Sequence, residues 1–127
     1  MADIWLTNPT YDAHLFVIVE EAQKGHVFLL NKMSDAVISH IQAKAADFTV
    51  VARRPVASMS TAGEHILGSG TIRGTKLMFH YGVFALGRHG FQILCSASPK
   101  TFEHVAATCE NVIESFTYEE KSPQAPV

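Results

Sequence analysis

The chain has 127 residues, of which 47% are hydrophobic and 17% charged, which is typical of one folded domain rather than a disordered segment. Ten Lys and Arg residues against twelve Asp and Glu residues give a formal net charge of −2. Nucleic-acid-binding domains are usually basic, so we expect no nucleic-acid partner. No apolar stretch approaches the roughly 20 residues that cross a bilayer, so we expect no transmembrane segment.

The N-terminus and the cysteines bear on the compartment. The first residues lack the basic and apolar regions of a signal peptide. The chain as it reads is therefore expected in the cytoplasm, and an exported or periplasmic location is expected if its N-terminus has been trimmed. Cys95 and Cys109 are too few for a disulfide framework and lie in apolar patterns, which favours buried core thiols. A disulfide between them, from a strand to the following helix, remains an alternative.

The first half predicts two strands and a helix. The strands are Ile4–Thr7 and His14–Glu20, separated by a turn at Pro9. The second strand is apolar on both faces in its middle, which predicts layers above and below the sheet. A helix is predicted over Ser34–Asp47, with Ser34 as its N-cap, because apolar residues recur there at spacings of three and four.

The second half predicts a run of short strands with turn residues between them. Neighbours joined by such short turns must pair antiparallel. The strands are Thr49–Arg54, Ala57–Thr61, His65–Ile72, Lys76–Leu86 and Phe91–Ser98.

The strongest local signal is the last helix. Ser98 is a suitable N-cap and Pro99 suits the first helical position. A full apolar stripe follows, made of Phe102, Val105, Ala106, Cys109, Val112, Ile113 and Phe116. Glu103, Glu110 and Glu114 fall on the opposite side of the helix, which we expect to be solvated.

The predicted order is therefore β-β-α-β-β-β-β-β-α, an α+β fold with an antiparallel sheet and two main helices. We expect one domain over residues 1–118 and a flexible C-terminal tail over residues 119–127, which turns polar.

No motif indicates catalysis. The stretch Gly68–Gly74 lacks the spacing of a dinucleotide fingerprint and lies between strands rather than before a helix. There is no GxSxG motif, and the two cysteines lie in apolar positions where a thiolate is disfavoured. We therefore predict no catalytic residues, no cofactor and no enzyme activity.

Three residues are candidates for binding. Arg88 and His89 lie on a tight turn between Gly87 and Gly90, and loops on a rigid scaffold often carry binding residues. His80 lies on the preceding strand. His80, His89 and Cys95 could approach one another across this hairpin as a metal site, although separate histidines are the favoured interpretation and no metal is predicted.

The second half resembles PsbP-like domains. The resemblance is carried by an Ala62-Gly63 turn that opens a strand, the apolar strand FQILC, the Ser-Ala-Ser-Pro cap, the helix with Phe102, and the closing Ile113–Phe116. The first half agrees in outline, and the resemblance covers about residues 4–118. The superfamily includes the extrinsic PsbP protein of photosystem II, the Ran-binding Mog protein and bacterial relatives of the DcrB type.

The resemblance implies an α/β/α sandwich that acts as an accessory or protein-binding module, since relatives bind protein partners and some bacterial members act as chaperones in secretion. It carries no functional residue over to this chain. Family domains usually open with an additional strand, so an exposed sheet edge or face is the expected contact for a protein partner, with a homodimer left open. The alternative is a domain that binds a small molecule or metal in the sheet–helix gap or at the histidine-bearing hairpin.

Overall fold

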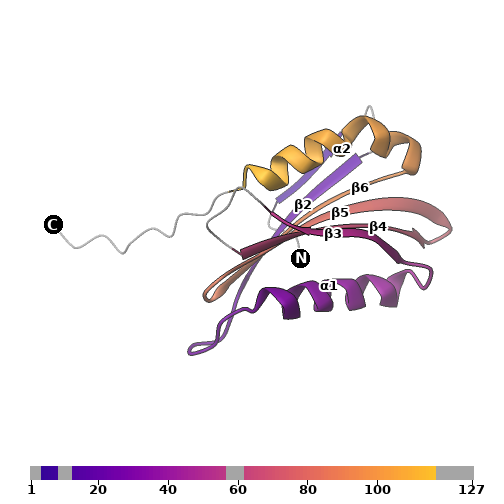
Figure 1. Ribbon diagram of the computed structural model, residues 1–127. Coiled ribbons are helices and arrows are strands. Elements are labelled where there is room, and N and C mark those ends of the chain that lie inside the picture. Colours follow the sequence, from indigo (N-terminus) through magenta and orange to yellow (C-terminus); the bar gives the residue numbers. More distant parts are fainter. Residues whose placement is uncertain (1–3, 9–12, 57–61, 117–127) are drawn as a thin grey trace.

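The computed structural model describes residues 4–8, 13–56 and 62–116, which form one antiparallel sheet with a helix on each face (Figure 1). The six strands lie in the order β1-β2-β6-β5-β4-β3. The strands are β1 (Ile4–Asn8), β2 (Ala13–Glu21), β3 (Thr49–Pro55), β4 (Ala62–Ile72), β5 (Thr75–Leu86) and β6 (His89–Ala97), and the helices are α1 (Leu30–Lys44) and α2 (Pro99–Glu114).

This architecture confirms the predicted α+β fold class and the α/β/α sandwich. The described order is β-β-α-β-β-β-β-α, with four strands between the helices where the sequence predicts five. The additional predicted strand, Ala57–Thr61, lies outside the described residues, as does the predicted tail over residues 119–127.

Two tight hairpins build the centre of the sheet. Ile72 pairs with Thr75 across a turn in which Arg73 and Gly74 both have positive φ, of 51° and 78°. Leu86 pairs with His89 across a turn that begins at Gly87, with φ of 58°. Both geometries match the twist of antiparallel strands, so the turns fix the register of β4, β5 and β6.

Helix α1 begins one turn earlier than predicted. Ser34 does not cap it, because the helix begins at Leu30 and no side chain bonds to its N-terminus. Met33 lies one turn before Val37 on the same stripe, and Ser34 beside it is fully buried against the sheet. The helix ends at Lys44, and Asp47 instead lies in the following turn, where its carboxylate accepts hydrogen bonds from Thr71 N and Oγ1, each of 2.8 Å.

Helix α2 begins where the sequence predicts. Ser98 is its N-cap, with the hydroxyl accepting a hydrogen bond from the backbone N–H of Thr101, and Pro99 is its first residue. Its buried residues are Phe102, Cys109 and Ile113, all from the predicted stripe.

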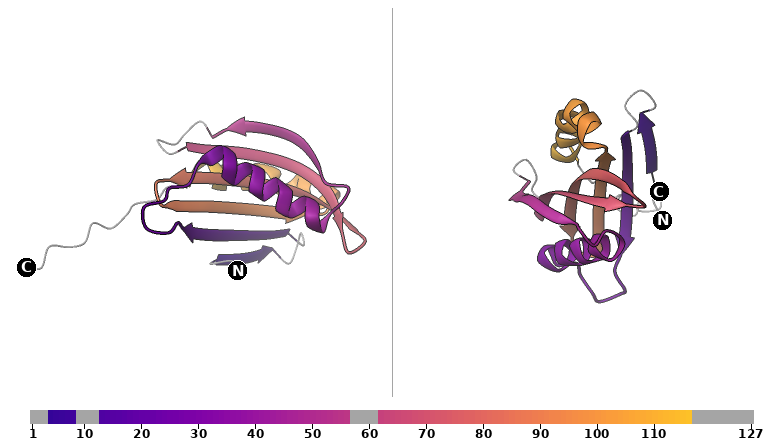
Figure 2. Two further views of the ribbon diagram at one scale, coloured as in Figure 1. Left: turned by 90° about the horizontal axis from the view of Figure 1, so that it is seen from below. Right: turned by 90° about the vertical axis from the view of Figure 1, so that its right-hand side faces the viewer.

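The two helices cover different parts of the sheet. Helix α2 packs mainly on β5 and β6, and α1 packs on β4 and β5 of the other face. Seen from the side of α1, strands β2 and β1 extend beyond the helix (Figure 2). One half of this face is therefore not covered by a helix.

Candidate functional site

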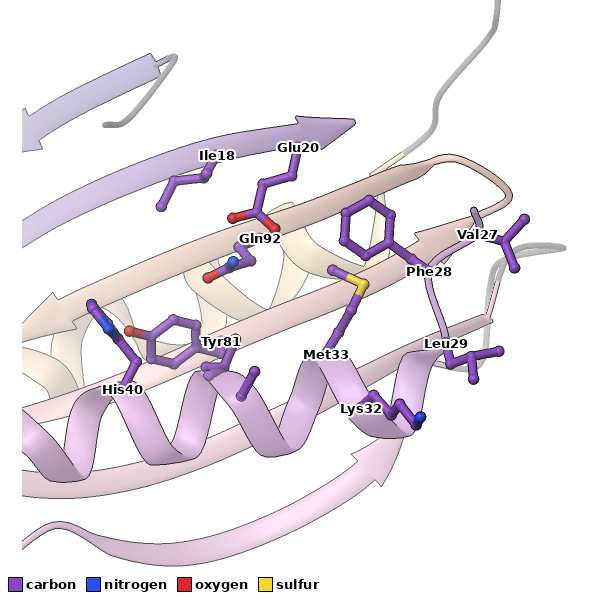
Figure 3. A pocket seen from close by; sticks show the side chains of 12 residues that line it. Ile18, Glu20, Val27, Phe28, Leu29, Lys32, Met33, His40, Tyr81 and Gln92 are labelled. Carbon is purple, nitrogen blue, oxygen red and sulfur yellow. The ribbon is translucent and has the colours of Figure 1, made fainter. Parts of the chain in front are cut away.

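A groove of about 700 Å³ lies between α1 and the half of the sheet that α1 does not cover (Figure 3). Helix α1 forms one wall, strands β2, β5 and β6 form the floor, and the connection between β2 and α1 closes one end. The lining residues are Ile18, Glu20, Val27, Phe28, Leu29, Lys32, Met33, Ala36, Val37, His40, Tyr81 and Gln92.

The groove exists because α1 packs on β4 and β5 and leaves the α1-facing side of β2 and part of β6 uncovered. Met33 and Phe28 rest directly on the backbone of β6 at Gly90, where an added Cβ would lie 2.6 Å from Met33 Cε and 3.3 Å from Phe28 Cδ1. Beyond this contact, residues Ile18 and Gln92 of the sheet have no helix above them. Methionine is flexible and polarisable, so Met33 gives the groove an adaptable wall.

Polar groups are spaced along the apolar lining. Lys32 and His40 extend from α1, about two helical turns apart, while Glu20 and Gln92 come from the strands opposite (Figure 3). Tyr81 lies in the floor, and burial raises the pKa of its phenol, so this hydroxyl stays protonated and can donate a hydrogen bond. The site therefore offers an apolar channel with a donor at its floor and opposite charges on its two sides.

The rim of the groove is apolar and exposed. Val27 is 62% exposed and Leu29 is 51% exposed, and both line the end of the groove. Two large apolar side chains held in water beside a groove of this size are typical of an interaction surface.

The rim is held in place by the turn between β5 and β6. Phe28 N–H donates to Gly87 O at 2.8 Å, and Ala22 N–H donates to Arg88 O at 2.7 Å. The Arg88 guanidinium donates in turn to Ala22 O at 3.0 Å and lies 3.2 Å from Glu21 Oε1. Arg88, which the sequence suggests as a binding residue, thus anchors the connection that bears the rim.

The other two predicted residues do not join Arg88 in one site. His89 opens β6, half-buried, with its ring stacked on Phe91. His80 pairs with Cys95, six residues along β5 from the Leu86–His89 pair, a separation of about 20 Å. The hairpin therefore does not bring His80 and His89 together. Within the described residues there is no group of three or more His, Cys, Asp or Glu side chains arranged to hold a metal ion.

A buried polar chain lies on the opposite face, beneath α2. His65 and His80 are only 2% and 6% exposed, and His65 Nδ1 lies 3.0 Å from His80 Nε2. His65 Nε2 lies 2.6 Å from Glu114 Oε1. Because a carboxylate only accepts, His65 donates to Glu114 and accepts from His80. Burial, together with the neighbouring His65, lowers the pKa of His80 to about 4, so His80 is neutral at pH 7.

Arg54 of β3 connects the buried polar side chains His80, His65 and Glu114 to the surface. Its guanidinium pairs with Glu110 and lies 3.5 Å from Glu114 Oε1. The carboxylates of Glu110 and Glu114, which were expected to be solvated, thus contact a side chain of the sheet. A small cavity of about 140 Å³ lies beside the two histidines, with Arg54 and Glu110 in its lining.

The adjacent Arg53 makes the corresponding contact on the other face. It donates to Glu64 Oε1 at 2.7 and 3.1 Å and lies 3.8 Å from Asp35 Oδ1 of α1. Successive residues of β3 therefore connect this edge strand to both helices. Local sequence patterns do not predict these contacts, because Arg54 and Glu110 are 56 residues apart.

Comparison with solved structures identifies the architecture. The chain superposes on cyanobacterial PsbP (CyanoP) from Synechocystis sp. PCC 6803 with a TM-score of 0.72 and 9% sequence identity, over 93% of this chain and 75% of that one. The fold is PsbP-like. The chain also superposes on PA94, a protein of unknown function from Pseudomonas aeruginosa, with a TM-score of 0.74 and 10% identity, over 93% of this chain and 82% of PA94.

Sequence comparison does not extend this result. No protein-family model matches the chain, and no curated protein matches it. Among the described residues, neither helix is long and apolar enough to cross a membrane. The PsbP-like fold is therefore supported by structural superposition alone.

Proposed function

We propose that this PsbP-like domain is a non-enzymatic accessory module that binds a protein partner by taking an apolar segment of that partner into the groove beside α1. The observation that carries the proposal is the exposed rim of Val27 and Leu29 at the end of a groove of about 700 Å³. A partner segment that fills the groove would also cover the rim, which favours a macromolecule over a ligand confined to the cavity.

The polar groups of the groove suit a polypeptide. Tyr81 and Gln92 can bond to main-chain groups of a bound segment, while Lys32 and Glu20 can pair with charges on its two sides. The contact uses an uncovered sheet face rather than a sheet edge. Edge strand β3 is less suited to adding a strand, because it contains a register irregularity between Val50 and Ala52.

The absence of enzyme activity is part of the proposal. Its support is that the buried polar chain of His65, His80 and Glu114 lies under α2, on the face of the sheet opposite to the groove. The lining of the groove supplies binding groups and includes no serine, threonine or cysteine side chain.

The test is equilibrium binding of fluorescein-labelled synthetic peptides. Each peptide carries a run of Leu and Phe between neutral polar residues, and its partner peptide carries Ser in that run. We expect only the apolar peptides to bind, with Leu29→Glu weakening binding at least about fivefold, because burying the exposed half of a leucine contributes about 1 kcal/mol. Gly90→Ala should also weaken binding, because its Cβ would lie 2.6 Å from Met33 Cε and so forces this wall of the groove to shift.

The matched control is Val51→Glu on β3, where Val51 is 59% exposed and remote from the groove. Equal affinity for the apolar and Ser peptides, or equal effects of Leu29→Glu and Val51→Glu, would contradict the proposal. A photoreactive residue at position 29, with the same group at position 51 for comparison, then identifies the partner in cells.

A small apolar molecule is the second candidate, because the groove volume falls in the range of small-molecule sites. The probe is 1-anilinonaphthalene-8-sulfonate. A small-molecule site predicts one molecule bound per chain and no effect of Leu29→Glu, whereas the proposed peptide site predicts that the apolar peptides displace the dye.

A further inference from the structure

The small cavity beneath α2 connects two buried histidines with the surface. It has a volume of about 140 Å³ and lies between α2 and strands β3, β4 and β5. The side chains of Arg54 and Glu110 are 47% and 44% exposed, whereas His65 and His80 are almost fully buried. Because two half-exposed side chains belong to its lining, the cavity opens to solvent with α2 in place.

His80 offers an unused hydrogen-bond acceptor in this cavity. Its Nε2–H donates to His65 Nδ1 at 3.0 Å, and His65 Nε2–H donates to Glu114 Oε1 at 2.6 Å. The imidazole of His80 therefore keeps a lone pair on Nδ1. Within the described residues no hydrogen bond reaches this nitrogen, and it is not sealed from solvent. Since His80 lines the cavity, Nδ1 is an acceptor that a ligand there can use.

The charges around the cavity favour a cation. Arg54 pairs with Glu110 and lies 3.5 Å from Glu114 Oε1, so one positive group stands between two carboxylates. Both histidines are neutral in this arrangement, because each has one donor and one acceptor nitrogen. The cluster therefore carries an excess of negative charge, which a bound cation would offset and a bound anion would increase.

The remaining walls are apolar and suit a body the size of one ring. They are formed by Ala52 and Leu67 from the sheet and by Phe102 and Ala106 from α2. The rest of this layer is apolar as well, since Cys95 and Cys109 are buried free thiols. An engineered protein cavity of about 150 Å³ holds one benzene molecule. A cavity of about 140 Å³ therefore has room for one aromatic ring or an alkyl group of similar size.

We propose that this cavity is a binding site for a small primary amine in its ammonium form. The ammonium group donates hydrogen bonds to His80 Nδ1 and to the Glu110 carboxylate, and the apolar body packs against Leu67 and Phe102. An ammonium group has only donors, which match these acceptors. A hydroxyl group can donate to His80 but does not offset the charge, and a carboxylate does neither. The site therefore prefers an amine to an alcohol and an alcohol to an acid.

The test titrates the full chain with three probes that share one aromatic ring: benzylamine, benzyl alcohol and benzoate. Binding is followed by NMR spectra of the ring nitrogens of 15N-labelled histidine, in which His80 is assigned by comparison with His80→Gln. We expect benzylamine to bind at one site and to shift the Nδ1 resonance of His80. It should bind at least about fivefold more tightly than benzyl alcohol, as expected for a partly exposed ion pair, and benzoate should bind most weakly.

Substitutions in α2 locate the site. Ala106→Leu fills the cavity with a larger side chain and should abolish benzylamine binding. The matched control is Ala107→Leu, on the exposed side of the helix, which should bind benzylamine as the wild type does. Glu110→Gln should weaken the binding of benzylamine and leave that of benzyl alcohol unchanged, so that the preference between the two probes falls.

The proposal is overturned by equal affinity for the three probes, by tighter binding of benzoate, or by no benzylamine binding at millimolar concentrations. Benzylamine binding that survives Ala106→Leu would place the amine elsewhere and would also overturn it. Leu29→Glu, in the groove on the other face of the sheet, should leave benzylamine binding unchanged. None of these results bears on peptide binding in the groove.

Discussion

Lowering the pH should destabilise the protein through His80. The pKa of this imidazole is lowered from its ordinary value of 6.5 to about 4, first because it is buried and second because of the adjacent His65. Below pH 6.5 the unfolded chain takes up a proton that the folded chain refuses until about pH 4, so the free energy of unfolding falls as the pH falls through this range. The difference of about 2.5 pH units corresponds to about 3 kcal/mol lost by pH 4, with no contribution from His80 above pH 6.5.

The assay is urea unfolding followed by circular dichroism at pH 7.5, 6.5, 5.5 and 4.5. His80→Gln removes the titration and keeps an N–H that can donate to His65 Nδ1. We expect its free energy of unfolding to fall less than that of the wild type between pH 6.5 and 4.5, by about 2 to 3 kcal/mol. His26→Gln, in the exposed connection before α1, is the control and should retain the wild-type dependence. Parallel curves for the wild type and His80→Gln would refute the reasoning.

Three further substitutions test the packing of the helices. Ser34→Ala should raise the free energy of unfolding by about 1 kcal/mol, because the buried Ser34 hydroxyl has no hydrogen-bond partner among the described residues; a loss of stability in urea would contradict this. Gly82→Ala should cost about 2 kcal/mol, since its Cβ would lie 2.7 Å from Ile113 Cγ2. In an Ile113→Ala background that cost should shrink, and a double-mutant cycle showing full additivity would be the negative result. Arg54→Gln should cost about 1 kcal/mol in low salt and less in 0.5 M NaCl through loss of its pair with Glu110, whereas a cost independent of salt would indicate another cause.

Local signals in the sequence predict local structure well. The start of α2 follows from Ser98 and Pro99, which act within one helical turn. The same reasoning fails at Ser34, because a serine before an apolar stripe is consistent both with a cap and with a small residue inside a helix. Burial of Ser34 against the sheet decides between these two roles. The apolar residues Leu30 and Met33 extend the stripe before Ser34, and they are the sequence signal that the helix begins earlier.

The groove and the buried chain could not be predicted in this way. The groove depends on which strands α1 crosses, and no residue pattern within α1 specifies that. Likewise, His65 and Glu114 are 49 residues apart in the sequence. The helical periodicity of α2 places Glu114 off the apolar stripe, where a solvated residue is expected. Strand pairing brings His65 beside His80, and the packing of α2 on the sheet brings Glu114 to His65. The hydrogen-bonded series His80–His65–Glu114 therefore forms only when both tertiary contacts are made.

The anchoring of the groove rim to one hairpin bears on where the chain can be extended or labelled. The turn at Gly87–Arg88 is bonded to the connection before α1, so an inserted tag there would displace Leu29 together with the turn. The turn at Arg73–Gly74 is exposed, and nothing lies within 4 Å of a Cβ built at Gly74. A fluorophore or epitope placed at Arg73–Gly74 would leave the groove intact. A label on that hairpin can therefore be used to follow binding in the groove without changing the groove itself.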